Sequence, residues 1–241
     1  VKMNFEKIKT INVKNKPSWD GKLFLTFDVD WCSDEVLSYT LDIVEKYDIN
    51  STFFITHQTA LLDRMRENPK IELGIHPNFN PLLNGDFQYG RSIREVIEFY
   101  KKIVPEAVSV RSHSLTQSSN ILDVFSNFGL KYDCNHFVPY SSNIDLKPWD
   151  HWDGKLIKIP YSWEDDVHCV YGWDWHTDFL NNRNIKVFDF HPIHIFLNTE
   201  HLDRYEKSRE FHGSLEKLSA YVYDGYGTYN FLIDLINKGI K

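Results

Sequence analysis

The chain has 241 residues, of which 42% are hydrophobic and 15% aromatic, and its formal net charge is -7. This composition excludes a disordered chain, because it supplies enough apolar surface for a sizeable core. Lysine and arginine are scattered among the acids, so the charge argues against nucleic acid as a partner and is compatible with a short glycan.

The hydrophobic pattern predicts alternating strands and helices from residue 23 onward. Seven strands are predicted, at 23–27, 52–55, 71–75, 108–110, 131–134, 156–160 and 186–190. Helices are predicted over 33–47, from 61 to before Pro69, over 92–104 and 119–128, and finally through 231–236. Repeated β–α units favour a parallel sheet, and right-handed crossovers place all of its strand ends on one face. We expect a single α/β domain over 1–241, with a core at about 20–197 and a C-terminal extension at 198–241.

The cysteines and the apolar runs bear on where the protein acts. Cys32, Cys134 and Cys169 are widely spaced and contain no CxxC pair, so no disulfide scaffold is expected. No apolar run reaches the roughly 18 residues of a membrane-spanning helix, and the first residues lack the apolar region of a signal peptide. We therefore expect a cytoplasmic protein without a transmembrane segment.

Side chains capable of chemistry follow five of the predicted strands. They are Asp28 with Asp30, His76, Arg111, Asp165 with Asp166, and His191. Asp28 and Asp30 follow one apolar strand, and two carboxylates that close repel each other unless a cation or a proton lies between them. Mixed carboxylate and imidazole ligands suit a divalent metal. With a carboxylate to activate water and a histidine to protonate a leaving amine, the set would make an amide hydrolase.

These five segments, in this order, resemble the polysaccharide deacetylase family, also called carbohydrate esterase family four, over about residues 20–197. The run Thr26-Phe27-Asp28-Val29-Asp30 is similar to a variant of the first family motif. The resemblance implies a deformed (β/α) barrel of about seven strands. It also implies that Asp28 is the general base and that Asp30 is a metal ligand.

The second and third motifs leave one ligand open. The run from His76 to Asn80 resembles His-x-x-x-His, so His76 is implied as a metal ligand, but Asn80 stands where the second histidine is expected. In the third motif, Arg111 is implied to orient the base through an ion pair. His113 adds an imidazole two residues later, so either His113 or Asn80 could complete the metal site.

The last two motifs are expected to supply substrate contacts and the catalytic acid. The fourth family motif holds an aspartate that pairs with the arginine and a tryptophan that lines the pocket. Residues 163–166 are the preferred match and 172–176 the rival, so Trp163, Asp165 and Asp166 are expected at the substrate, together with Trp31. His191 matches the fifth motif and is implied as the catalytic acid. His194, three residues later, is either its partner or a core histidine, and the core interpretation is preferred.

The resemblance implies a metal-dependent deacetylase that removes the N-acetyl group of a sugar in bacterial surface-polysaccharide metabolism. One divalent ion is implied, zinc first, with cobalt or nickel as alternatives. Two other functions stay open: an amidohydrolase for a small formyl or ureido substrate, and an inactive glycan-binding module, which the asparagine at position 80 motivates. A homo-oligomer and the role of residues 198–228, as a lid or an oligomer contact, are also open.

Overall fold

A single mixed sheet organises the chain. The computed structural model describes residues 3–176, 180 and 185–240, so residues 1–2, 177–179, 181–184 and 241 of the predicted domain lie outside the described residues. In this part the strand order is β7-β8-β6-β5-β4-β3-β2-β10-β9, and β1 also pairs with β2. The strands are β1 (Asn4–Phe5), β2 (Lys22–Asp28), β3 (Ser51–Ile55), β4 (Ile71–Ile75), β5 (Ser109–Val110), β6 (Tyr132–Phe137), β7 (Trp149–Asp150), β8 (Ile157–Tyr161), β9 (Trp163–Glu164) and β10 (Lys186–Phe190).

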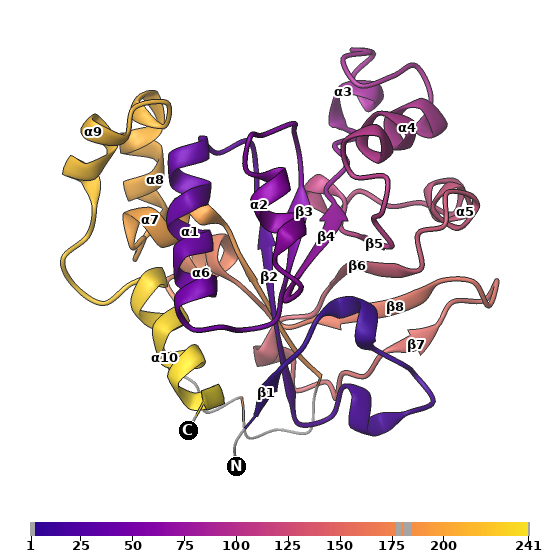
Figure 1. The fold of residues 1–241 in the computed structure, drawn as a ribbon, viewed down its shortest axis with the longest axis horizontal. Coiled ribbons are helices and arrows are strands. Elements are labelled where there is room, and N and C mark those ends of the chain that lie inside the picture. Colours follow the sequence, from indigo (N-terminus) through magenta and orange to yellow (C-terminus); the bar gives the residue numbers. More distant parts are fainter. Residues whose placement is uncertain (1–2, 177–179, 181–184, 241) are drawn as a thin grey trace.

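The α/β barrel-like architecture is confirmed, but the prediction of about seven strands is wrong. The described residues form ten strands, and the three extra ones, β1, β7 and β9, have two residues each. Two residues are too few to show a hydrophobic period. The strand β5 (Ser109–Val110) is equally short, but Val108 and Val110 on either side of Ser109 marked it in the sequence. All pairs are parallel except β7 with β8. The strands turn progressively from β2 to β8 without closing on themselves, which gives an open, deformed barrel (Figure 1).

Helices cover the sheet and bury its central strands. They are α1 (Asp34–Lys46), α2 (Leu62–Glu67), α3 (Asn80–Leu83), α4 (Ile93–Ile103), α5 (Ser119–Asn127), α6 (Asp165–Tyr171), α7 (Pro192–Leu197), α8 (Leu202–Ser208), α9 (Leu215–Leu218) and α10 (Thr228–Ile240). Strands β3, β4 and β10 are buried along their whole length. Parallel strands are covered on both faces, so the polar side chains within these strands, such as Glu72 and Asp189, are buried as well.

Local signals fix the first helix. The Ser33 side chain accepts a hydrogen bond from the Val36 N–H at 3.4 Å, which caps α1 at its N-terminus. Leu37, Leu41 and Val44 then recur at helical spacing and are buried in the main core. The polar turn between β2 and α1 is therefore held in place, and this turn carries Asp30.

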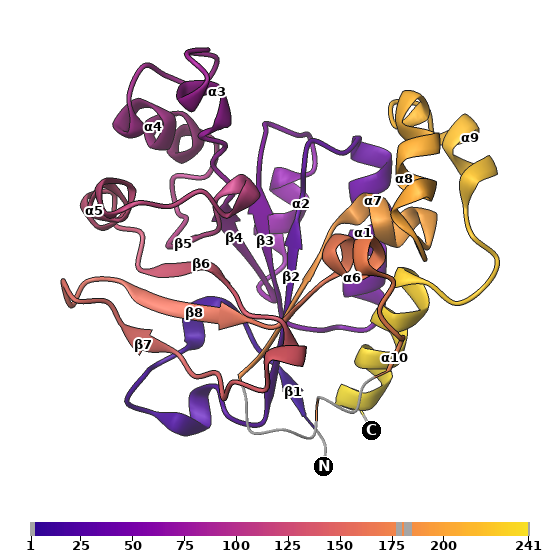
Figure 2. The same ribbon diagram turned by 180° about the vertical axis from the view of Figure 1, so that it is seen from behind.

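The C-terminal extension flanks the strand ends. In both views α7, α8 and α9 lie on one side of β2, and α3 and α4 lie on the other (Figures 1 and 2). Helix α7 packs against α1 and against α10. Among the described helices, none combines the length and the apolar character that crossing a membrane requires.

Candidate active site

The predicted gathering of side chains is present at one edge of the sheet. Asp28 ends β2, His76 follows β4, Arg111 follows β5 and His191 follows β10. These four strands run parallel within the same sheet, so their C-terminal ends meet at one edge. Chemically active residues from sequence positions far apart therefore face a common site, as in other α/β proteins.

A sharp turn after β2 aims Asp30 into the site. Asp30 and Trp31 both adopt left-handed backbone conformations, with φ of 44° and 54°. Such conformations are unfavourable for residues other than glycine and persist where the surroundings hold them. The Trp31 N–H donates to Thr56 Oγ1 at 3.0 Å, which anchors this turn to the segment after β3.

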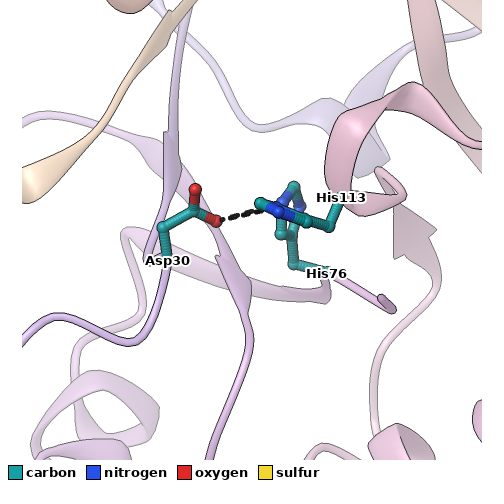
Figure 3. Close-up of side chains that lie close together, drawn as sticks. All are labelled: Asp30, His76 and His113. Atoms are coloured by element: carbon teal, nitrogen blue, oxygen red, sulfur yellow. Dashed lines mark ion pairs between the residues drawn. The ribbon is translucent and has the colours of Figure 1, made fainter. Parts of the chain in front are cut away.

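Asp30, His76 and His113 form a compact group with metal-ligand chemistry. Asp30 Oδ1 lies 3.2 Å from His76 Nε2 and 3.4 Å from His113 Nδ1. Figure 3 shows both imidazoles turned toward this carboxylate. Within the described part of the chain, Asp30 Oδ1 is buried without a hydrogen-bond partner. A buried carboxylate oxygen that lies between two imidazoles without a hydrogen bond fits a divalent cation, because buried polar atoms otherwise make hydrogen bonds.

Asn80, the other candidate ligand, contacts the loop that carries His113. Its side-chain Nδ2 donates to Ser114 Oγ at 3.2 Å, and its Oδ1 accepts from Thr116 Oγ1 at 3.4 Å. The His113 N–H donates to the Pro77 carbonyl at 3.0 Å. The nitrogen and the oxygen of the Asn80 amide group therefore both make hydrogen bonds to the loop next to the group formed by Asp30, His76 and His113.

Arg111 is completely buried and bridges two carboxylates. Its Nη1 donates to Asp28 Oδ1 at 2.9 Å and to Asp189 Oδ1 at 2.5 Å. The guanidinium lies between the rings of Phe54 and Tyr161, 4.7 and 4.5 Å from their centroids. Burial works against the charge, but Asp189 and Asp28 outweigh it and place the pKa of Arg111 well above its ordinary value.

The partners of Arg111 correct the expectation for the fourth motif. The sequence interpretation placed the arginine's aspartate within 163–166, whereas the structure pairs Arg111 with Asp189 in β10. Asp165, expected at the substrate, is fully buried and bound to His191. The signal for Asp189 was present in the sequence: a carboxylate inside an apolar strand requires a charged partner.

His191 is held by Asp165 and faces Asp30. The His191 N–H donates to Asp165 Oδ2 at 2.7 Å, and its Nδ1 lies 2.7 Å from Asp165 Oδ1. Its Nε2 is 3.6 Å from Asp30 Oδ2. Burial alone would lower the pKa of His191, but the charge and hydrogen bond of Asp165, with Asp30 adding to them, raise it well above its ordinary value.

The aromatic residues expected at the substrate separate into two kinds. Trp163 has no exposed surface and packs against Phe190 and Phe231, so it belongs to the core rather than to the substrate surface. Its Nε1 donates to His168 Nδ1 at 3.1 Å. Trp31, in contrast, is 37% exposed and its ring centroid lies 5.1 Å from that of His113.

Two cavities meet at the site. One of about 100 Å³ is lined by Asp28, Asp30, His76, Ser112, His113, Ser114, Leu115, Tyr161, Glu164, Asp166 and His191. A second of about 160 Å³ shares Asp30, Asp166 and His191 with the first. Asp166 therefore lies where substrate contact was predicted, and the rival segment 172–176 lines neither cavity.

The second cavity also reaches residues that the sequence interpretation missed. Tyr205 and His212, from the C-terminal extension, form part of its wall, and His194 lines it as well. His194 is buried, and its Nδ1 lies 3.1 Å from Thr199 Oγ1. No local motif marks Tyr205 or His212, because the packing of α8 and of the short turn that follows it brings them to the site.

The chain is similar to one protein family and to several solved structures. The model of a family described as WbmS-like polysaccharide deacetylase matches residues 25–209. A proposed polysaccharide deacetylase involved in O-antigen biosynthesis, WbmS from Bordetella bronchiseptica, is 44% identical with a TM-score of 0.94, over 98% of each chain. A family 4 carbohydrate esterase from Streptomyces lividans, solved with acetate, is 13% identical with a TM-score of 0.44, over 90% of this chain and 88% of that one. No curated protein sequence matches this chain.

Proposed function

The chain belongs to the WbmS-like polysaccharide deacetylase family, and from this premise we propose that it is a metal-dependent deacetylase that hydrolyses the N-acetyl group of a sugar in a bacterial surface polysaccharide. The proposal rests on one observation: a candidate base and a candidate acid, each held in place by a charged partner, lie beside one candidate metal site. Asp28 is held by Arg111, His191 is held by Asp165, and Asp30 lies near both His76 and His191.

Asp30, His76 and His113 are the residues that would hold the metal. Two imidazoles and a carboxylate suit zinc, with cobalt or nickel as alternatives. His113 is preferred over Asn80 because its Nδ1 is close to Asp30, whereas the Asn80 amide bonds to the loop around His113. When bound, a divalent ion supplies polarisation of the acyl oxygen and a lower pKa for the attacking water.

Asp28 is suited to act as the general base. Its Oδ1 accepts a hydrogen bond from Arg111 Nη1 at 2.9 Å. Its Oδ2 lies 3.4 Å from Nδ1 of the candidate metal ligand His76. The Arg111 guanidinium holds this carboxylate in place through an ion pair, and a carboxylate in its ionised form can accept a proton. In the proposed reaction Asp28 takes a proton from the water that attacks the acyl carbon.

His191 is suited to act as the general acid. An ionised Asp165 can only accept hydrogen bonds, so His191 Nδ1 carries a hydrogen and Nε2 is the nitrogen that faces the site. As the carbon–nitrogen bond breaks, the protonated imidazole gives its Nε2 proton to the departing amine. One water is consumed, and the products are acetate and the free amino sugar.

The substrate class rests on the similarity to WbmS. That protein is described as involved in O-antigen biosynthesis, and 44% identity over nearly the whole chain supports a sugar of the same class here. The Asp28–Arg111 and His191–Asp165 ion pairs argue against an inactive binding module. A protein that only binds a glycan needs neither a base oriented by an arginine nor an acid oriented by an aspartate.

Release of acetate from acetylated amino sugars tests the proposal. Metal-loaded protein is incubated with N-acetylated, O-acetylated and N-formylated amino sugars, and the released acid and free amine are quantified. We expect acetate from N-acetyl substrates, a loss of about 100-fold or more in kcat for Asp28→Asn, and no change for the exposed control Asp48→Asn. Formate release alone would favour the small-substrate amidohydrolase. Undiminished activity in Asp28→Asn would refute the assigned base.

A further inference from the structure

The loop that carries His113 depends on support from outside itself. His113 begins a short 3-10 turn, η3 (His113–Leu115), in which Ser114 and Leu115 both have left-handed φ values, of 55° and 53°. Neither residue is glycine, so this backbone is unfavourable unless neighbouring groups hold it. A loose loop would place the His113 imidazole imprecisely relative to Asp30 and His76.

A buried asparagine holds the start of this loop. The Ser112 N–H donates to Asn135 Oδ1 at 2.8 Å, and both residues are buried. Asn135 lies in β6, where the register with β8 shifts between Asp133 and His136. A local irregularity of this kind redirects side chains. Here it accompanies an Asn135 amide that reaches the residue immediately before His113.

The orientation of the Asn135 amide is fixed by an ion pair behind it. Asn135 Nδ2 donates to Asp133 Oδ1 at 2.6 Å, and the Asn135 N–H donates to the same atom at 3.1 Å. Asp133 Oδ2 is paired with Lys158 Nζ, and both side chains are buried. Because an ionised carboxylate only accepts, the amide nitrogen must face Asp133 and the amide oxygen must face Ser112.

This arrangement is costly, and it lies outside the reacting centre. Burying a lysine and an aspartate carries a desolvation penalty that their attraction only partly offsets. Neither Asp133 nor Lys158 lines the cavities at the site. We infer that Asn135, oriented by the Asp133–Lys158 ion pair, is a positioning residue that presents His113 to the metal and thereby sets the affinity of the site. The inference rests on the metal centre of the proposed function.

Metal affinity, measured apart from activity, tests this inference. Metal-free wild type, Asn135→Ala and Asn135→Ser are titrated with Co²⁺ by its visible absorption and with Zn²⁺ against a chromophoric chelator. The serine variant keeps a polar side chain in the buried position, but this side chain is too short to reach the Ser112 N–H. It therefore provides the test if the alanine variant does not fold. Residues that support metal ligands typically contribute about 10- to 100-fold to affinity, and we expect a loss of that size in both variants.

The control is a buried polar cluster at the opposite end of the sheet. Glu72, near the start of β4, accepts hydrogen bonds from Ser109, Thr52 and the Lys9 N–H. Both Glu72→Gln and the Asn135 variants are expected to lower the melting temperature, but Glu72→Gln should leave metal affinity unchanged. Wild-type affinity in the folded Asn135 variants, or an equal loss in Glu72→Gln, would overturn the positioning role alone. A wild type that binds no metal would overturn the metal centre and this inference together.

Discussion

Both carboxylate oxygens of Asp165 accept hydrogen bonds from His191, one from its backbone N–H and one from its ring Nδ1, each at 2.7 Å. The two bonds fix the imidazole in position and in tautomer, so that Nε2 faces the site. Asp165 begins α6 and His191 follows β10, so the relationship joins parts of the chain that are 26 residues apart.

Replacing Asp165 tests this relationship. Asp165→Asn removes the charge that favours the imidazolium and permits the wrong tautomer, so kcat for deacetylation should fall by about 100-fold or more with a much smaller change in KM. The control is Asp153→Asn, whose carboxylate accepts from the N–H groups of Lys155 and Leu156 in a turn between β7 and β8. Steady-state kinetics on the same substrate compares the variants, and an active Asp165→Asn would refute the role of Asp165.

Trp31 is the aromatic residue that we expect to contact the sugar. Its indole is 37% exposed and lines the second cavity, and stacking of a sugar on such a ring contributes a modest free energy. Trp31→Ala should therefore raise KM about 2- to 10-fold with little effect on metal content. Trp152, which is 78% exposed and lines neither cavity, supplies the control variant Trp152→Ala. Equal KM values for the two variants would remove Trp31 from the substrate surface.

Gly74 sets the spacing of the strand that leads to His76. A Cβ atom at this position would lie 2.7 Å from Phe54 Cδ1 and 2.9 Å from the Ser109 carbonyl oxygen. Gly74→Ala should therefore lower the free energy of unfolding by about 1–3 kcal/mol in urea denaturation. At Gly213 a Cβ would meet no atom within 4 Å, so Gly213→Ala should change stability by less than about 0.5 kcal/mol. Similar losses in both variants would contradict the close packing around Gly74.

His168 makes stability depend on pH. Burial lowers the pKa of His168 to about 4, although Asp165 acts in the opposite direction. The pKa of histidine in an unfolded chain is about 6.5, so between these values the unfolded chain binds a proton that the folded protein does not. This contribution to stability is complete above about pH 6.5 and is lost as the pH falls toward about 4. Chemical denaturation should show a shallower pH dependence for His168→Gln than for wild type, and parallel profiles would disprove the assignment.

The sequence predicted the parts of the site that follow strands. Asp28, Asp30, His76, Arg111 and His191 could be assigned to one edge because parallel strands bring their C-terminal ends together. The seven predicted strands also agree in position with β2, β3, β4, β5, β6, β8 and β10. Periodicity and strand order were therefore enough to bring these candidate site residues to one edge of the sheet.

Pairings across the fold could not be predicted in the same way. Asp189 bonds to Arg111 over 78 residues, and Asp165 turned out to support His191 rather than a substrate. Trp163 matched a pocket motif but is enclosed by Phe190 and Phe231. Each outcome depends on side-chain packing between distant elements, which no local pattern specifies.

The metal content of the purified chain tests the central claim most directly. Elemental mass spectrometry is applied to wild type, Asp30→Ala, His113→Ala and Asn80→Ala after incubation with Zn²⁺, Co²⁺ or Ni²⁺. A metallohydrolase with Asp30, His76 and His113 as ligands predicts about one metal per chain in wild type and in Asn80→Ala, and a loss in the other two variants. A wild type without metal, or loss in Asn80→Ala with retention in His113→Ala, would contradict this assignment.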